Sequence, residues 1–148
     1  MKYDLVRFIE AQNKENYFYD FSISYYESAI DEIKSAEKKS HWIWYIFPQI
    51  KGLGVSPESE FYGLEGINEA KEYLNHPLLS ERLINCFKII YNTDKGLYPI
   101  FREDEKKVWA CATLFSLAND NHSEIFNLII EKFFNQTNHN KTIQLLNL

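Results

Sequence analysis

The sequence predicts an all-α fold, a compact single-domain helical array of about six to seven helices. Apolar residues recur at three- and four-residue steps along most of the chain, which is the spacing of a buried helix face. The length of 148 residues suffices to bury a core without disulfides or metals. No repeat, low-complexity tract or linker divides the chain, so we expect one helical domain spanning residues 1–148.

The first two helices are expected at Asp4–Gln12 and Ser22–Glu37. Asp4 is the candidate N-cap of the first helix, and Ser22 or Asp20 is the candidate N-cap of the second. The second helix has the clearer apolar stripe, which consists of Ile23, Tyr26, Ile30 and Ile33.

The segment Ser40–Gln49 allows two interpretations. Its aromatic and β-branched residues favour a strand by propensity, yet a run of this length also suits a buried helical turn. Trp42 and Trp44 are two residues apart, so on a helix their side chains point roughly 200° apart. On a helix, one of them should therefore lie in the core and the other should face a site or the surface. Gly52–Gly54 and Ser56–Pro57 mark a loop after this segment.

Five further helices are expected in the second half of the chain. Their apolar stripes predict helices at Ile67–Asn75, Pro77–Asn92, Asp104–Ala118, Ile125–Phe134 and Lys141–Leu146. Gly96 and Pro99 interrupt the pattern, which predicts a loop at Asp94–Phe101.

The charge and the apolar runs exclude several classes of partner. The formal net charge is −5, whereas nonspecific nucleic-acid binding needs a basic face, so we expect no strong nucleic-acid partner. The first ten residues lack the apolar core of a secretory signal, and no apolar run is long enough to span a membrane. We therefore expect a cytoplasmic protein with no membrane partner. The oligomeric state is left open.

Most catalytic and cofactor motifs are missing. The four histidines show no HExxH or paired Cys/His spacing, so no metal site is expected. No dinucleotide fingerprint, P-loop or GxSxG elbow occurs, so no cofactor is expected either. Cys86 and Cys111 lie in helical apolar patterns, which favours buried free thiols over a catalytic nucleophile.

One segment has the composition of a ligand site. Between residues 40 and 63, polar side chains alternate with aromatic rings around a Gly-Leu-Gly turn, which suits a concave site that stacks a flat ligand and binds its polar edge. His41 is a candidate catalytic residue here, and the candidate ligand-binding residues are Trp44, Gln49, Ser56, Ser59 and Tyr62. The alternative is that the aromatic rings are core, that Gln49 braces the loop and that His41 caps a helix.

A second polar cluster begins the helix expected at Asp104. Asp104 and Lys107 are three residues apart, so they share a helix face. We predict that this helix start lies next to the segment His41–Gln49, with Asp104 as a second catalytic candidate and Lys107 as a ligand for an anionic group. The alternative is a capping Asp104 and a solvated Lys107.

These residues carry a resemblance to a known family. The stretch Ser40–Gln49, followed by Gly-Leu-Gly, Ser-x-x-Ser and Tyr-Gly, resembles the signature of a bacterial and fungal family of unknown function catalogued as 1810. Further matching motifs are Asp104-x-x-Lys107, Thr113-Leu114-Phe115, Phe133-Phe134 and Thr142-x-x-Leu145-Leu146. The resemblance implies a mainly helical fold in which the segment around Trp42 is helical. It implies no activity.

Two functions from different classes fit these observations. The first is an enzyme or receptor for a nucleotide-like or ADP-ribose-like small molecule, held in an aromatic and polar pocket with a phosphate on Lys107. The second is a non-catalytic protein-interaction module, in which the same segment is only a scaffold. A deep pocket lined by His41, Gln49 and Tyr62 would favour the ligand, whereas burial of these side chains without a cavity would favour the scaffold. The sequence leaves open whether the protein is an enzyme.

Overall fold

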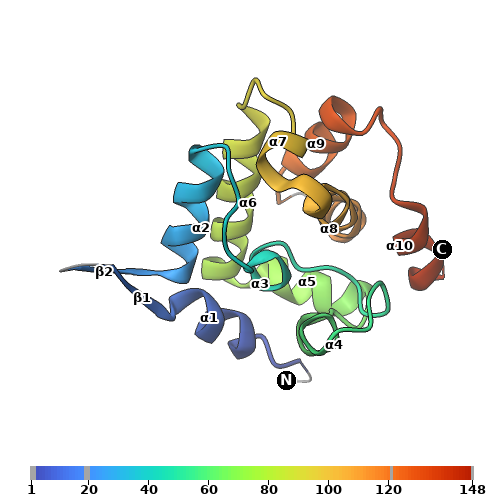
Figure 1. Ribbon diagram of the computed structural model, residues 1–148. Coiled ribbons are helices and arrows are strands. Elements are labelled where there is room, and N and C mark those ends of the chain that lie inside the picture. The colour runs from blue at the N-terminus through green and yellow to red at the C-terminus, as the bar shows by residue number, and fades with distance from the viewer. Residues whose placement is uncertain (1–2, 19–20, 121, 148) are drawn as a thin grey trace.

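The computed structural model describes residues 3–18, 21–120 and 122–147. The chain is mostly helical, which confirms the predicted class, and the helices surround a common apolar core (Figure 1). The helices outnumber the six to seven expected, because three short segments are also helical: α3 (Ile43–Ile46), α4 (Pro57–Tyr62) and α7 (Tyr98–Phe101). Proline lies in the first turn of both α4 and α7, where its missing N–H costs no hydrogen bond. Proline therefore starts these helices instead of marking loops.

The N-terminal part contains a hairpin that the sequence did not predict. Its elements, in order, are α1 (Val6–Asn13), β1 (Glu15–Phe18), β2 (Phe21–Ser24) and α2 (Tyr25–Lys34). The two strands pair antiparallel, and the hairpin projects away from the helices (Figure 1). No side chain caps α1, so the expected capping by Asp4 was wrong.

Helix α2 begins later than its apolar stripe predicted. Ser24, rather than Ser22, is its N-cap: the Ser24 hydroxyl accepts from the amide of Glu27, and the Glu27 carboxylate accepts from the amide of Ser24. This reciprocal capping box fixes the helix start and leaves the preceding residues free to form the strand. Asp20, the other expected cap, lies outside the described residues.

The helices of the second half begin and end within one residue of their predicted bounds. They are α5 (Ile67–Asn75), α6 (Pro77–Tyr91), α8 (Glu105–Ala118), α9 (Ile125–Phe133) and α10 (Asn140–Leu146), and a 3-10 turn, η1 (Arg102–Asp104), precedes α8. His76 and His139 are the N-caps of α6 and α10, because an imidazole nitrogen of each accepts from a backbone amide.

The core ties the Ser40–Gln49 segment, called the signature segment below, to the long helices. Helix α8 packs against α5 and α9, and α6 packs against the same two helices. Phe47, at the end of α3, lies edge-on to Phe87 with 5.2 Å between ring centres, and Phe87 lies edge-on to Phe126 at 5.6 Å. The signature segment is thus anchored in the middle of the helical array.

The two tryptophans of the signature segment have different environments. The segment forms the helical turn α3 and no strand, as the family resemblance implied. Trp42 is only 1% exposed and packs edge-on against Phe101, whereas Trp44 is half-buried. Trp42 is therefore the core residue of the pair, and Trp44 is the one that reaches the surface.

Two predictions about the rest of the chain concern its thiols and its longest helices. Cys86 and Cys111 are free and buried, as predicted, and burial raises the pKa of the Cys86 thiol to about 12. Such thiols are poor nucleophiles at neutral pH.

Among the helices that the structure describes, none is both long and apolar enough to cross a membrane.

Replacing the two tryptophans in turn tests this assignment. Trp42→Ala should lower the free energy of unfolding by about 3–5 kcal/mol, because it leaves a large cavity in the core. Trp44→Ala should cost roughly 1–2 kcal/mol, since Trp44 is only partly buried and packs at the edge of the core and against Lys107. Urea denaturation followed by circular dichroism measures both values. Equal losses for the two variants would contradict the assignment.

Candidate functional site

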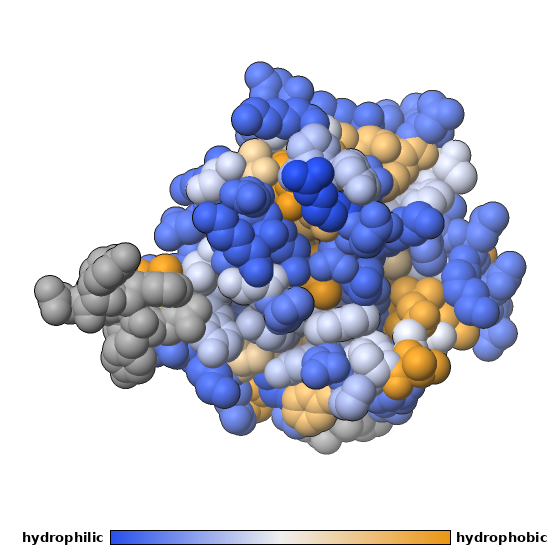
Figure 2. All heavy atoms as spheres, viewed as in Figure 1, coloured by the Kyte–Doolittle hydropathy of each residue, from blue (hydrophilic) through white to orange (hydrophobic). Residues whose placement is uncertain are grey.

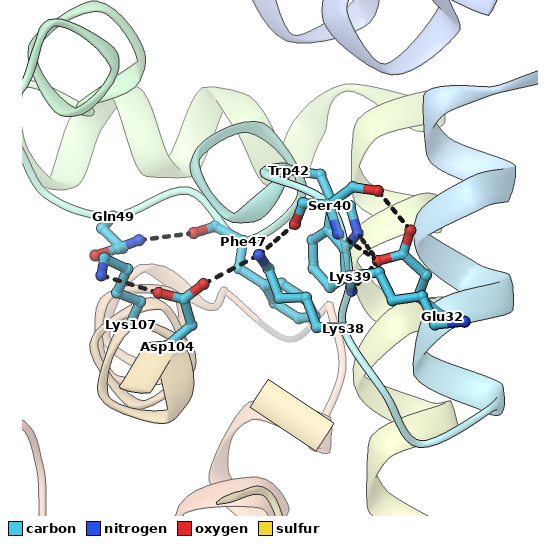
Figure 3. A network of polar contacts seen from close by, with 9 residues as sticks. All are labelled: Glu32, Lys38, Lys39, Ser40, Trp42, Phe47, Gln49, Asp104 and Lys107. Carbon is cyan, nitrogen blue, oxygen red and sulfur yellow. Dashed lines mark hydrogen bonds and ion pairs between the residues drawn. The ribbon is translucent and has the colours of Figure 1, made fainter. Parts of the chain in front are cut away.

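Glu32 of α2 holds the start of the signature segment. Its carboxylate accepts hydrogen bonds from the amides of Lys39 and Ser40 at 2.6 and 2.9 Å, from the Ser40 hydroxyl at 2.8 Å and from the Trp42 indole at 2.9 Å (Figure 3). Burial alone would raise the pKa of Glu32, but these bonds more than offset it and hold the pKa below its usual value of 4.5. The carboxylate is therefore ionised at neutral pH, with both oxygens in use.

Asp104 joins the other end of this polar network to α8. One carboxylate oxygen lies 3.1 Å from the ammonium of Lys38, and the other lies 3.0 Å from that of Lys107 (Figure 3). Burial alone would raise the pKa of Asp104, but the hydrogen bonds and charges of Lys107 and Lys38 hold it below its usual value of 3.8. The Lys38 ammonium also donates to the carbonyl of Ser40.

Both lysines lie over the tryptophans of the signature segment. The Lys38 ammonium is 4.9 Å from the centre of the Trp42 ring, and that of Lys107 is 5.2 Å from the centre of the Trp44 ring. Each cation is thus held by an aromatic face and by Asp104. The predicted proximity of the α8 start and the signature segment is present, but this arrangement uses Asp104 and Lys107 for internal contacts.

Gln49 lies in the same region, because it lines one small cavity with Trp44, whose ring Lys107 covers, but it does not lie in a deep pocket. Its side chain is 6% exposed and donates to the carbonyl of Phe47 at 3.4 Å (Figure 3). The small cavity that it lines together with Trp44, Ser59 and Tyr62 measures only about 10 Å³. That volume accommodates about one water molecule. The sequence brought these four residues together correctly, while the space for a nucleotide is missing at this point.

Ser56 and Ser59 start α4. The Ser56 hydroxyl accepts from the amide of Ser59 at 3.1 Å, and the Ser59 hydroxyl donates to the carbonyl of Ser56 at 2.9 Å. Gly63 then ends the helix where a side chain would come within 2.7 Å of the Ser59 carbonyl. These contacts are those of a helix cap and a close backbone approach, so they account for the Ser-x-x-Ser and Tyr-Gly motifs without a ligand.

The larger hollow lies on another side of the signature segment. It measures about 930 Å³ and is lined by Asp4, Arg7, Glu10, Ala11, Asn13, Lys14, Tyr25, His41, Tyr45, Glu58, Phe61 and Tyr62. We call it the tyrosine groove. A second hollow of about 260 Å³ shares Tyr25, His41 and Tyr45 with it. The groove contains two of the predicted site residues, His41 and Tyr62, and neither hollow is lined by Asp104 or Lys107.

Three half-buried tyrosines form one wall of the groove. Tyr25 of α2 and Tyr45 of α3 are stacked with 6.4 Å between ring centres, and Tyr45 is 5.5 Å from Tyr62 of α4. Burial, together with the neighbouring Tyr25, Tyr62 and Glu32, raises the pKa of Tyr45 well above its usual 10.0. Burial also raises the pKa of Tyr62. Both hydroxyls therefore stay protonated at neutral pH and can donate hydrogen bonds.

Arg7 lines the groove, but its guanidinium is already used in contacts within the protein. Its guanidinium pairs with Glu69 of α5 at 2.9 Å and donates to the carbonyls of Phe61 and Gly63. The Arg7 side chain is 9% exposed and that of Glu69 is 2% exposed, so the pair is nearly buried. This pair fixes α1 against α4 and α5.

The sequence did not single out Tyr25, Arg7 or Glu32, and it placed Tyr45 in the aromatic segment without choosing it as a site residue. Tyr25 and Tyr45 belong to different helices, and Arg7 and Glu69 are 62 residues apart. A local spacing rule cannot link such pairs. The available signal was the aromatic excess of the chain, which includes ten tyrosines.

The two predicted catalytic residues lie in different places. His41 is exposed in the groove, but Asp104, the other catalytic candidate, is bound to two lysines and lies outside the groove lining. In the part of the chain that the structure describes, no group of three or more His, Cys, Asp or Glu side chains could hold a metal ion.

Comparisons with known proteins agree with this fold. Residues 2–146 match the model of a family described as Protein of unknown function (DUF1810), which confirms the predicted resemblance. The crystal structure of the conserved hypothetical protein Rv1873 from Mycobacterium tuberculosis is similar to this chain, with 32% sequence identity and a TM-score of 0.87. The match covers 98% of this chain and 97% of that chain. No curated protein matches the chain.

The role of Asp104 as an internal anchor predicts how stability depends on pH. Its folded-state pKa is lowered, so its contribution is present above pH 3.8 and is lost as the pH falls through the folded-state value. Asp104→Asn should cost about 1 kcal/mol at pH 7, since two partly exposed ion pairs are lost. The variant should also lose less stability than the wild type between pH 5 and pH 3. Denaturant unfolding across this range measures both effects. If the free energies of unfolding of the variant and the wild type fall in parallel as the pH is lowered, Asp104 does not have this role.

Proposed function

We propose that this chain, which belongs to the DUF1810 family of proteins of unknown function, binds a small organic molecule in the tyrosine groove. The observation that carries the proposal is the wall formed by Tyr25, Tyr45 and Tyr62. Among the described residues, no hydrogen bond uses the hydroxyl of any of these three tyrosines. Half-buried phenols without a protein partner are available to a ligand, and a hollow of this size suits a small molecule.

The wall offers two kinds of contact to one molecule. The ring faces of Tyr25 and Tyr45 can pack against a flat or alkyl body, and the hydroxyls can both donate and accept hydrogen bonds. His41 lies where the two hollows meet, so a ligand that extends from one to the other would contact it. This geometry supports the ring and sugar parts of the nucleotide-like and ADP-ribose-like ligands considered from the sequence. Lys107, which was expected to meet a phosphate, does not line the groove.

Binding without catalysis is the simpler form of the proposal. General acid–base chemistry needs a titratable group within reach of the ligand and a pKa near the working pH. Asp104 does not line the groove, and its pKa is lowered, so its carboxylate stays ionised at neutral pH. His41 is the one predicted catalytic residue at the groove, and the proposal gives it a binding role.

A protein-interaction module is the second candidate, and exposed apolar side chains favour it. Val6, Val55 and Phe61 are 53%, 97% and 57% exposed. On the face shown in Figure 2, apolar patches lie near α4 and α10, surrounded by hydrophilic surface. Phe61 also lines the tyrosine groove, so a protein partner would cover the same site. A thermal-shift screen with small molecules separates the two candidates, because only the first requires a hit.

The proposal predicts a ligand whose stabilisation depends on the groove. A small molecule at about 100 times its Kd adds about 2.7 kcal/mol to the folded state, which raises the Tm of a chain of this length by roughly 5–10 °C. The double variant Tyr25→Phe/Tyr45→Phe keeps the rings and should lose at least half of this shift, because it lacks the hydroxyl contacts.

Tyr98→Phe is the matched control, since Tyr98 is 48% exposed and lies outside the groove lining. It should shift like the wild type. A metabolite screen without any stabilising compound would refute small-molecule binding. Hits that stabilise the double variant as much as the wild type would refute the groove as their site.

A further inference from the structure

The rim of the tyrosine groove has an excess of negative charge. Asp4, Glu10 and Glu58 line it and are exposed, and none of the ion pairs among the described residues includes them. Of the arginine and the lysine in the lining, Arg7 is already paired with Glu69, which leaves Lys14. Three free carboxylates thus face one free ammonium. An anionic ligand would be repelled there, and a cationic one would be attracted.

In the part of the chain that the structure describes, the rings of the groove tyrosines are not covered by a cation of the protein itself. Some other rings are: Lys38 covers Trp42, Lys107 covers Trp44, Arg82 covers Tyr26 and Lys132 covers Tyr91, at 4.8–5.2 Å from the ring centres. No side chain in the described ranges places a cation over Tyr25, Tyr45 or Tyr62. The groove therefore combines carboxylates with aromatic faces that remain open to a cation from outside.

From these two observations we infer that the ligand of the tyrosine groove carries a positive charge, in the form of an alkylammonium or guanidinium group. The inference rests on the proposed function and adds the charge of the ligand to it. The cation would lie against the tyrosine rings, with Glu10 and Glu58 as its counter-charges. Both carboxylates line the groove together with Tyr62, whose pKa they raise while Arg7 lowers it.

Carboxylates and aromatic faces contribute in complementary ways. The rings bind the cation and the alkyl chain next to it, and they remain effective in salt. The carboxylates act through water and are screened by ions. A cation that uses both should bind more weakly as salt rises, without losing all affinity. The groove is open, so the group can belong to a free amine or to a lysine or arginine side chain of a peptide.

The experiment is a titration followed by two-dimensional NMR and calorimetry, with five probes at low and high salt. Spermidine represents free amines, and a blocked lysine-containing tripeptide and argininamide represent side chains of a protein. Adenosine is the neutral probe and AMP is the anionic one. We expect at least one of the three cations to bind, with shifts confined to the groove and an affinity that falls at least threefold from 50 to 500 mM salt.

Charge variants test the assignment of the counter-charges. Glu10→Gln and Glu58→Gln should each weaken binding of the cation about fivefold, the effect of removing one charge about 4 Å away through water. Glu60→Gln is the matched control, because Glu60 is exposed on the same helix as Glu58 and lies outside the groove lining. All three positions are exposed, so the variants should melt within 1–2 °C of the wild type.

The outcomes separate this inference from the proposed function. Binding of adenosine or AMP in the groove, without binding of any cation, would overturn the positive charge and leave the groove as a ligand site. Cations that bind equally to Glu10→Gln, Glu58→Gln and Glu60→Gln would also overturn it. Absence of binding by every probe would overturn the charge assignment, and the metabolite screen would then decide the groove itself.

Discussion

The carboxylate of Glu32 is the contact on which the candidate site depends. Helix α3 has four residues and no side-chain cap, so it has no means of holding its own position. Glu32 supplies that position from α2, by accepting four hydrogen bonds from the three residues Lys39, Ser40 and Trp42. The same anchor sets Tyr45 of α3 against Tyr25 of α2, which creates the wall of the tyrosine groove.

Most polar residues of the signature segment and its surroundings serve the fold. Asp104 and Lys107 hold α8 to the segment, Gln49 closes a small cavity, and Ser56 caps α4. The groove is built instead from residues with few internal partners, namely three tyrosine hydroxyls and three rim carboxylates. Much of the signature segment is thus explained by contacts within the fold, and the proposed ligand site lies beside it. Of the residues that the sequence singled out, His41 and Tyr62 line the groove, whereas Gln49, Ser56 and Lys107 make contacts within the fold.

The sequence predicted the second-half helices well, because each has an apolar stripe of more than one turn. It missed the hairpin, because the start of α2 is decided by the capping box between Ser24 and Glu27. The spacing of apolar residues gives no information about that capping box. It predicted that Lys107 and Gln49 would meet, on the strength of a shared family motif. It could not predict the groove, because Tyr25, Tyr45 and Tyr62 come from three helices, and their convergence depends on Glu32 and on the Arg7–Glu69 pair. Neither of those contacts has a local spacing that a sequence pattern could reveal.

Hydrogen exchange in the variant Glu32→Gln tests the central claim most directly. A neutral amide cannot accept all four hydrogen bonds, so the Trp42 indole N–H and the amides of Lys39 and Ser40 should exchange at least tenfold faster than in the wild type. The amides of α8 and α9 should keep their protection, because these helices pack independently of Glu32. The Tyr45 ring resonances should shift as well. Unchanged exchange at residues 39–42, or a uniform loss of protection across all helices, would contradict the account.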